Sequence, residues 1–371
     1  MPRPGQRGWQ GAGADFRSAL YLGLRHGAPA GRTCWPALTL GMPAALQEPP
    51  GALALARELA RWQGCEAATL LPSTLHLYRD VFALLAQGGI VARPALLIDA
   101  AAYPIARWGA EWAALRGVPV RRFRHGDVRQ LERLTHQARH DGCAPVVLAD
   151  GYTPGDAWPP PLRAYLDIVA PLDGWLVLDD TQALGVLGPD GGGSVRLHGL
   201  QGMPLLAGAS LAKGLGAPLA VLAGPAPAIA AFERHSESRV HASPPSIAVI
   251  AAARAALRIN ARDGPRLRRT LLARIRQLRQ ALAAAGLACH GGGFPVQLVP
   301  LPDMAHDAAA ALAEHACAVL LRVKNGLALG LLLRADHSER DVARVAAMLA
   351  QRLGNLGDGH DDGIRDIAVF G

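Results

Sequence analysis

The sequence predicts an α/β protein with a large, mainly parallel central sheet and a smaller α+β domain toward the C-terminus. Three features support this fold class. Short apolar runs alternate with helical stretches from residue 64 to residue 180. These runs are apolar throughout, which is typical of strands buried on both faces in a parallel sheet covered by helices. From residue 294 onward the elements change in character, which indicates a second, smaller domain.

The size and composition of the chain agree with more than one domain. It has 371 residues, of which 50% are hydrophobic and 18% charged, so it can bury a large core and is too apolar for extensive disorder. We expect an N-terminal arm at 1–50 that contributes to the small domain, a large domain at 51–255, a small C-terminal domain at 256–356 and a mobile tail at 357–371.

The first helix is predicted over residues 52–63, because Leu55, Leu59 and Trp62 lie on one helical face and Gly64 ends the pattern. The runs that follow are assigned by length and periodicity in the same way. Strands are predicted at 68–72, 95–99, 118–123, 145–150 and 175–180, and helices between them at 78–87, 108–116, 128–139 and 160–170.

A long helical region begins at Ala226, and Ser243-Pro244-Pro245 interrupts it, because proline removes a backbone donor. The helix resumes and continues to about Ala285. The remaining elements define the smaller domain. Strands are predicted at 294–301, 319–323 and 327–335, and helices at 306–316 and 339–353.

Charge and cysteine content limit the classes of partner. The net charge is +8, but the arginines are scattered and form no recognisable nucleic-acid motif. A locally basic pocket for a phosphate-bearing substrate stays open. The five cysteines include no CxxC pair, so we expect reduced thiols and no metal site. Without an apolar signal core or about 18 consecutive apolar residues, we expect a soluble cytoplasmic protein that binds neither nucleic acid nor membrane.

Lysine is the rarest basic residue, since only Lys213 and Lys324 are lysines. Arginine cannot replace lysine in an imine, because its guanidinium stays protonated, so each remaining lysine is a candidate for chemistry. Lys213 is the better candidate, because the small residues at 208–217 leave room for a flat cofactor, and Ser210 could bond a phosphate. The alternative is a surface lysine in a glycine-rich loop.

Asp179 ends a buried apolar run, which places a carboxylate at the C-terminal end of a strand, where open parallel sheets bind ligands. Pyridoxal 5′-phosphate (PLP) needs an anion beside its pyridine nitrogen, because a protonated ring acts as an electron sink. Gln182 could donate a hydrogen bond to the ring's 3-oxygen. The alternative for Asp179 is a carboxylate that caps a turn.

Asp179 followed by Ser210-Leu211-Ala212-Lys213 has the order and spacing of the α-oxoamine synthase family of fold-type I PLP-dependent enzymes. The resemblance extends over most of the chain. The segments similar to the family are YLGL at 21–24, ELARWQG at 58–64, FRHGDVRQLERL at 123–134, ADG at 149–151, VLGPDGGG at 186–193 and RADHSERDV at 334–342.

The resemblance implies PLP as cofactor, bound to Lys213 as an imine and paired with Asp179 at the pyridine nitrogen. Tyr103 and Gln182 stand where the family has histidines. Tyr103 occupies the position that stacks on the ring, and an aromatic side chain can do so. Tyrosine does not supply the acid/base chemistry of imidazole at neutral pH.

Further roles follow from the same resemblance. Thr74 and Leu75 occupy positions whose backbone amides hold the phosphate at a helix start. Ser210 replaces a threonine, and Ser243 is the best match for a phosphate-binding residue from a neighbouring subunit. Arg322 matches the arginine that grips the substrate carboxylate, where a planar bidentate donor is suited.

The implied reaction is condensation of a small α-amino acid with an acyl thioester, through a Lys213 aldimine and a quinonoid. The family also implies a homodimer whose sites include residues of both subunits. Two alternatives stay open. An aminotransferase on the same fold would use an aromatic stacking residue such as Tyr103. A catalytically weakened homologue would bind PLP without turnover.

Overall fold

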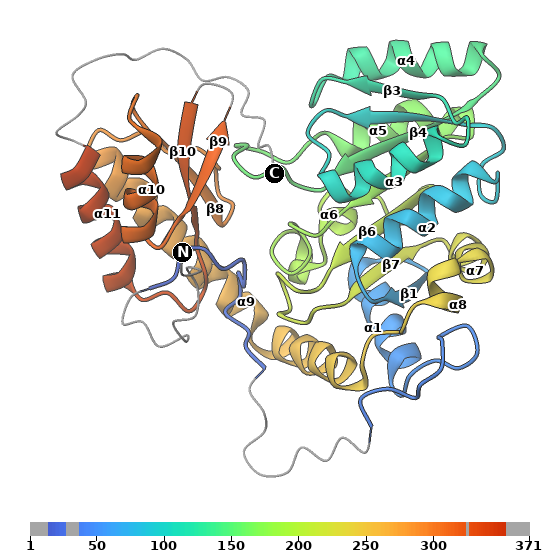
Figure 1. Cartoon of the computed structure of the whole chain (residues 1–371), viewed down its shortest axis with the longest axis horizontal. Helices are drawn as coiled ribbons and strands as arrows, with labels where there is room; N and C mark the ends of the chain where they lie inside the picture. The colour runs from blue at the N-terminus through green and yellow to red at the C-terminus, as the bar shows by residue number, and fades with distance from the viewer. Residues whose placement is uncertain (1–13, 27–36, 324–325, 354–371) are drawn as a thin grey trace.

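The computed structural model describes residues 14–26, 37–323 and 326–353. Figure 1 shows two lobes, one around each sheet, with helix α9 (Ile247–Ala284) running from the first lobe into the second. Segment 14–26 passes between the lobes. The expected mobile tail at 357–371 and Lys324 lie outside the described residues.

The large lobe contains a seven-stranded sheet in the order β1-β7-β6-β5-β4-β2-β3. Every neighbouring pair from β6 to β3 is parallel, and β7 runs antiparallel to both β1 and β6. The prediction of a mainly parallel sheet is therefore confirmed. The strands are β1 (Ala67–Leu71), β2 (Pro94–Asp99), β3 (Val120–Phe123), β4 (Ala144–Asp150), β5 (Trp175–Asp179), β6 (Leu205–Ser210) and β7 (Ala220–Gly224).

Helices cover both faces of this sheet, which explains the uninterrupted apolar runs. In β4, Val146 and Leu148 pack in one core with α2, α3 and α7, while Val147 and Ala149 pack in another core with α4 and α5. Successive strand residues thus bury on opposite faces. The helices of this lobe are α1 (Ala52–Gln63), α2 (Thr74–Ala86), α3 (Pro104–Ala114), α4 (Val128–His140), α5 (Leu162–Val169), α6 (Ser194–Leu197), α7 (Ala226–His235) and α8 (Glu237–His241).

The small lobe is an antiparallel sheet in the order β8-β10-β9, covered by helices. Helix α11 packs against α9. The α+β character predicted for this region is therefore confirmed. Its elements are β8 (Val296–Pro300), α10 (His306–His315), β9 (Val319–Val323), β10 (Gly326–Leu332) and α11 (Glu339–Leu353).

The structure differs from the sequence prediction at β6 and β7, two strands that the periodicity did not reveal. Residues 208–210, for which no strand was predicted, belong to β6. Their small side chains have low strand propensity, but the packing requires them. A Cβ at Gly208 would lie 2.8 Å from the Tyr78 hydroxyl oxygen, so a larger residue does not fit there.

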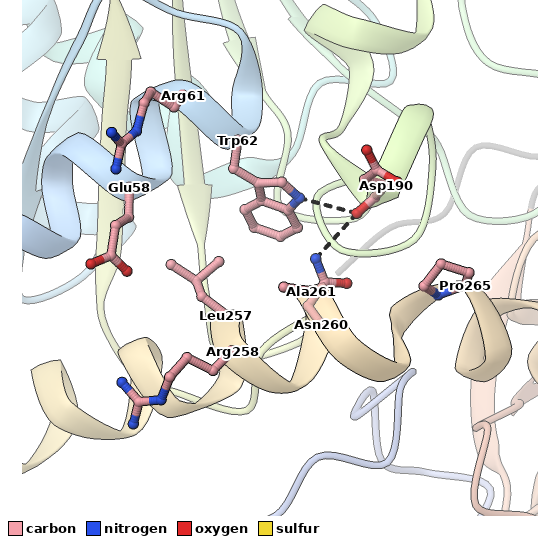
Figure 2. A pocket seen from close by; sticks show the side chains of 9 residues that line it. All are labelled: Glu58, Arg61, Trp62, Asp190, Leu257, Arg258, Asn260, Ala261 and Pro265. Carbon is pink, nitrogen blue, oxygen red and sulfur yellow. Dashed lines mark hydrogen bonds between the residues drawn. The ribbon is translucent and has the colours of Figure 1, made fainter.

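The predicted interruption of the helical region is confirmed between α8 and α9. Helix α9 begins after Ser246, whose hydroxyl accepts a hydrogen bond from the Val249 amide at 3.2 Å. Farther along α9, the Asn260 amide and the Trp62 indole of α1 both donate to the backbone oxygen of Asp190 (Figure 2). These bonds border an open cavity of about 500 Å³ and fasten α9 to the large lobe.

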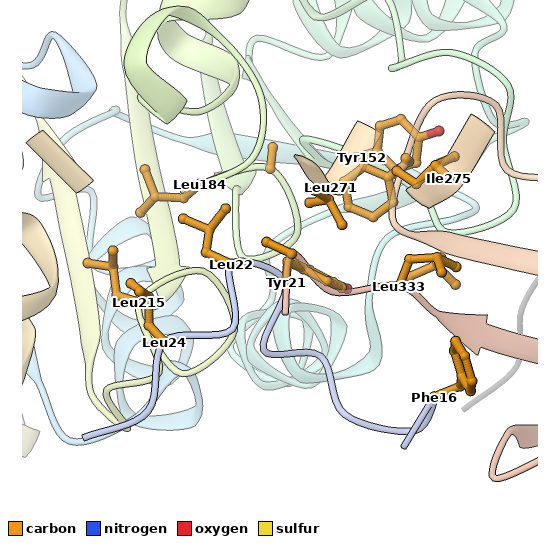
Figure 3. Packing of buried hydrophobic residues seen from close by; sticks show 14 of the residues in the cluster. Phe16, Tyr21, Leu22, Leu24, Tyr152, Leu184, Leu215, Leu271, Ile275 and Leu333 are labelled. Carbon is orange, nitrogen blue, oxygen red and sulfur yellow. The ribbon is translucent and has the colours of Figure 1, made fainter. Parts of the chain in front are cut away.

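Segment 14–26 connects the two lobes. On the small-lobe side, the Phe16 amide donates to Cys317 O, and the Ala335 amide donates to Tyr21 O. Figure 3 shows Leu22 and Leu24 lying beside Leu184 and Leu215 of the large lobe. We propose on these contacts that the arm contributes to the small domain, and the same contacts bring Tyr21 to the candidate site.

Candidate active site

A cavity of about 540 Å³ lies where the parallel strands end. Its walls come from the segments that follow β2, β4, β5 and β6, together with α3, β3 and the start of α2. Open α/β sheets bind ligands at this edge, and the volume is in the usual range for small-molecule sites. Six of the predicted site residues line the cavity: Thr74, Tyr103, Asp179, Gln182, Ser210 and Lys213.

Lys213 follows β6 and lies in the cavity. Its Nζ is 6.0 Å from the centroid of the Tyr103 ring. Burial lowers the pKa of Lys213, and the charges of Asp179 and Asp150 offset part of that effect. A lowered pKa increases the fraction of neutral amine, which is the form that attacks a carbonyl or accepts a proton.

Asp179 and Asp150 form a pair of buried carboxylates at the ends of adjacent strands. The register of β4 and β5 sets the two residues opposite each other. Burial raises both pKa values, and the Asp179 charge raises that of Asp150 further, well above its usual range. Hydrogen bonds from Thr181 and the charge of Lys213 lower the pKa of Asp179. Asp179 is therefore the member of the pair that favours the anionic form.

Asp150 is a site residue that sequence reasoning missed. Its Oδ1 accepts a hydrogen bond from the Tyr103 amide at 3.1 Å, which fixes the start of α3. The sequence did contain a signal, because Asp150 ends an apolar strand in the same way as Asp179. The strand order, which makes the two strands neighbours, was not evident from the sequence.

Gln182 is oriented by Tyr21 from the N-terminal segment. The Tyr21 hydroxyl donates to Gln182 Oε1 at 2.6 Å. Burial raises the pKa of Tyr21, so this hydroxyl keeps its proton. Because the amide oxygen of Gln182 accepts the hydrogen bond from Tyr21, the amide nitrogen of Gln182 is free to donate a hydrogen bond into the cavity.

We expect Tyr21→Phe to weaken cofactor binding by about 2–10-fold, because a neutral hydrogen bond contributes roughly 0.5–1.5 kcal/mol. Fluorescence titration of the apoprotein with PLP measures the affinity. Tyr152→Phe is the matched control, since its hydroxyl bonds the backbone oxygens of Asp156 and Gly291. Equal losses in both variants would contradict a specific role for Tyr21.

Hydroxyl groups gather at the β6 side of the cavity. Thr74 opens α2, and Ser210 ends β6. Thr181 Oγ1 accepts a hydrogen bond from the Ser210 amide at 3.0 Å, and Ser210 Oγ accepts one from the Ala212 amide at 3.3 Å. Hydroxyls beside a helix N-terminus could hold a phosphate.

Three predicted residues do not line the cavity. The Leu75 side chain is exposed and lines a separate pocket, although its expected contact is through the backbone. Ser243 is exposed in the segment between α8 and α9. Arg322 is exposed on β9 of the small lobe. The role of Arg322 therefore rests on the family resemblance alone.

Beside the cavity, His125 bridges two carboxylates. Its Nδ1 is 2.7 Å from Asp99 Oδ1, and its Nε2 is 2.8 Å from Asp156 Oδ2. Burial alone would lower the pKa of His125, but the hydrogen bonds and charges of Asp156 and Asp99 outweigh it and raise the pKa to about 10. The bridge ties the segment of Thr153 and Pro154, which line the cavity, to the sheet edge.

Because the folded-state pKa of His125 is raised, its stabilisation is complete below its unfolded value, near 6.5, and is lost as the pH rises through about 10. We expect the free energy of unfolding to fall by about 1–3 kcal/mol across that window, as charge-assisted hydrogen bonds are lost. Urea unfolding from pH 6 to 11 measures this change. His125→Gln should not show this fall in the free energy of unfolding. An identical pH profile in the wild type and the variant would contradict the stabilising role of protonated His125.

Comparison with known proteins identifies the relatives of this chain. Residues 39–346 match the family described as aminotransferase class I and II. An 8-amino-7-oxononanoate synthase of Alkalilimnicola ehrlichii is 32% identical over 315 residues, which cover 81% of this chain and 76% of that one.

Two solved structures share the fold. Serine palmitoyltransferase of Sphingomonas wittichii has a TM-score of 0.79 at 19% identity and covers 92% of this chain and 88% of its own. An 8-amino-7-oxononanoate synthase from Francisella tularensis has a TM-score of 0.72 at 15% identity, and the match covers 93% of this chain and 99% of that one.

These findings confirm the fold-type I architecture and PLP as the cofactor. Among the residues that the structure describes, no helix is both long and apolar enough to cross a bilayer. The family match spans most of the chain, and the relative exceeds 30% identity over most of its length. The chain therefore belongs to the aminotransferase class I and II family, as a PLP-dependent transferase of the α-oxoamine synthase group.

Proposed function

We propose that this protein condenses a small α-amino acid with an acyl thioester, by a decarboxylative or a simple Claisen-type reaction. The observation that carries the proposal is that the amine of Lys213, whose pKa is lowered by burial, and the carboxyl group of Asp179 line the same cavity. Relatives named 8-amino-7-oxononanoate synthase support acyl transfer over other chemistries of the family.

The residues present fit PLP. Asp179, buried at the end of β5, would pair with the pyridine nitrogen. Lys213 would bond to the aldehyde carbon, and the exposed ring of Tyr103 would offer a stacking face. Thr74 and Ser210 would hold the phosphate. When bound, PLP supplies an electron sink for the negative charge that develops on the amino acid α-carbon.

The chain's own groups divide the remaining tasks. Lys213 Nζ, with its lowered pKa, would accept the α-proton of the amino acid as a neutral amine. Asp179 would remain anionic and would favour the protonated form of the pyridine nitrogen beside it. Gln182, held by Tyr21, would donate a fixed hydrogen bond into the cavity. Asp150 would hold Tyr103 in place through the backbone amide.

We also propose that a second copy of the chain covers the mouth of this site. Leu75, Tyr103 and Trp108 are all exposed around the starts of α2 and α3, and Tyr103 also lines the cavity. Large exposed apolar side chains beside a site are typical of an interface. In such a homodimer, Ser243 of one copy would complete the phosphate site of the other. Sedimentation equilibrium on the full chain measures its mass directly.

A thiol-release assay tests the proposed reaction. The holoenzyme is incubated with a series of small amino acids and acyl thioesters, and both free thiol and amino ketone are quantified. We expect one thiol for each ketone formed. Perturbation of the cofactor spectrum by amino acids without thiol release from any acyl thioester would contradict acyl transfer.

An aminotransferase is the second candidate, and Tyr103 favours it, since an aromatic stacking residue suits amino-group transfer. The half-reaction separates the two functions. A keto acid would restore the original cofactor spectrum after exposure to an amino acid if the protein were an aminotransferase. A catalytically weakened homologue would show no spectral response to any small amino acid.

A further inference from the structure

Two arginines that line the cavity have no role in the chemistry described above. Arg107 lies on α3, one turn after Tyr103, and its amide donates to Tyr103 O. Arg122 lies on β3, opposite Ile98 of β2. Arg107 is partly buried, and Arg122 is more exposed at the edge of the sheet.

Among the described residues, neither guanidinium has a hydrogen-bond or ion-pair partner, and the Nε of Arg107 is fully buried. The Nε atoms of Arg196, Arg239 and Arg254 are also buried without a partner, but each of these side chains is bonded through a terminal nitrogen. Arg239 bonds Glu48 and Thr69, and Arg334 bonds Asp15 and Asp336. A buried charged donor without a partner is costly, which favours a ligand that completes Arg107, whereas Arg122 is exposed and is included because it lines the same cavity.

The strand order places Arg122 away from the phosphate-binding hydroxyls. Ser210 ends β6 and Lys213 follows it, on one side of β5, whereas β4, β2 and β3 lie in that order on the other side. At about 4.8 Å per strand, β3 lies roughly 14 Å from β5 and Asp179. An anion held by Arg122 is therefore distinct from a phosphate held at the β6 side.

We propose that Arg107 and Arg122 form an anion subsite that binds a carboxylate or phosphate of the substrate at the β3 side of the cavity. This inference rests on the proposed function, because it assigns a charged group to a substrate of the same site. Guanidinium groups suit such oxyanions, since they donate two parallel hydrogen bonds and stay protonated. Three groups could supply the anion: the carboxylate of the amino acid, a second carboxylate on the acyl chain, or a phosphate on the thioester carrier.

Calorimetric titration of the holoenzyme with inorganic phosphate, glutarate and butyrate tests the subsite without turnover. We expect Arg107→Gln and Arg122→Gln each to weaken binding of phosphate or glutarate by about 10–100-fold, the effect of losing a charge-assisted hydrogen bond. The affinity of Arg107→Lys for these probes should lie between those of the wild type and Arg107→Gln, since lysine keeps the positive charge but lacks the planar guanidinium that donates two parallel hydrogen bonds.

Arg116→Gln is the matched control, because it removes the same charge just beyond α3, where the guanidinium lies over Trp112. Equal weakening in Arg116→Gln, or unchanged binding in both cavity variants, would overturn the proposal. So would a tenfold loss of PLP affinity in Arg107→Gln with unchanged binding of the probes, since the pair would then hold the cofactor phosphate.

Steady-state kinetics then identifies the source of the anion. If Arg107→Gln and Arg122→Gln raise KM only for the amino acid, the subsite binds the carboxylate of the amino acid. If they raise KM only for the thioester, the subsite binds a group of the acyl donor. Preference for glutarate over phosphate separates a second carboxylate from a carrier phosphate. Arginine-dependent probe binding without thiol release would support the subsite while contradicting the proposed acyl transfer.

Discussion

Lys213→Ala is expected to lower turnover by about 10²–10⁴-fold or more, the range attributed to a positioned acid/base group. The variant loses both the amine that would bond to PLP and the base that would accept the α-proton. The visible absorbance of the bound cofactor should change with it. Stopped-flow absorbance and thiol release measure the two effects.

Lys213→Arg separates chemistry from charge. It keeps a cation in the cavity, but its guanidinium stays protonated and neither bonds to an aldehyde nor accepts a proton. We therefore expect it to be as inactive as the alanine variant. Lys324→Ala should retain activity. Substantial turnover in Lys213→Arg would show that the lysine acts only through its charge.

Asp179→Asn is expected to lower turnover by about 10²–10³-fold, the scale on which loss of one preorganised electrostatic group acts. The carboxamide cannot balance a protonated pyridine ring. It also removes the charge that raises the pKa of Asp150, so that carboxyl group should ionise at lower pH. Steady-state kinetics and PLP titration measure the losses in turnover and affinity.

Asp173→Asn is the control for Asp179→Asn. Asp173 is exposed in the turn before the same strand, at its opposite end, and its φ of 57° is one that asparagine adopts readily. We expect wild-type turnover and cofactor affinity. If both variants lost activity equally, the effect of Asp179→Asn would be one of strand stability.

Much of the fold could be predicted because burial on both faces makes the strands of the parallel sheet apolar throughout. Helix α1 lies at the predicted residues, and β5 differs from its prediction only at the last residue. Strands β6 and β7 escaped prediction because alanine and glycine dominate their local pattern. At Gly208 the constraint is the approach of Tyr78, a contact from a distant part of the sequence.

The candidate site was predictable where one residue type is chemically required. Lys213 stood out because lysine is rare here, and Asp179 because it ends a buried strand. Asp150 depends on which strands become neighbours, and the Tyr21–Gln182 bond joins segments far apart in sequence. Arg107 could not be distinguished among so many arginines, since its lack of a partner appears only in the folded chain.

Borohydride reduction of the holoenzyme followed by peptide mass mapping tests most directly whether Lys213 carries the cofactor. Reduction converts a lysine–PLP bond into one that survives proteolysis. Because the chain contains only two lysines, the label has two candidate positions. We predict a cofactor-derived mass on the peptide containing Lys213 and none on the peptide containing Lys324. Label on Lys324, or on neither peptide, would contradict the account.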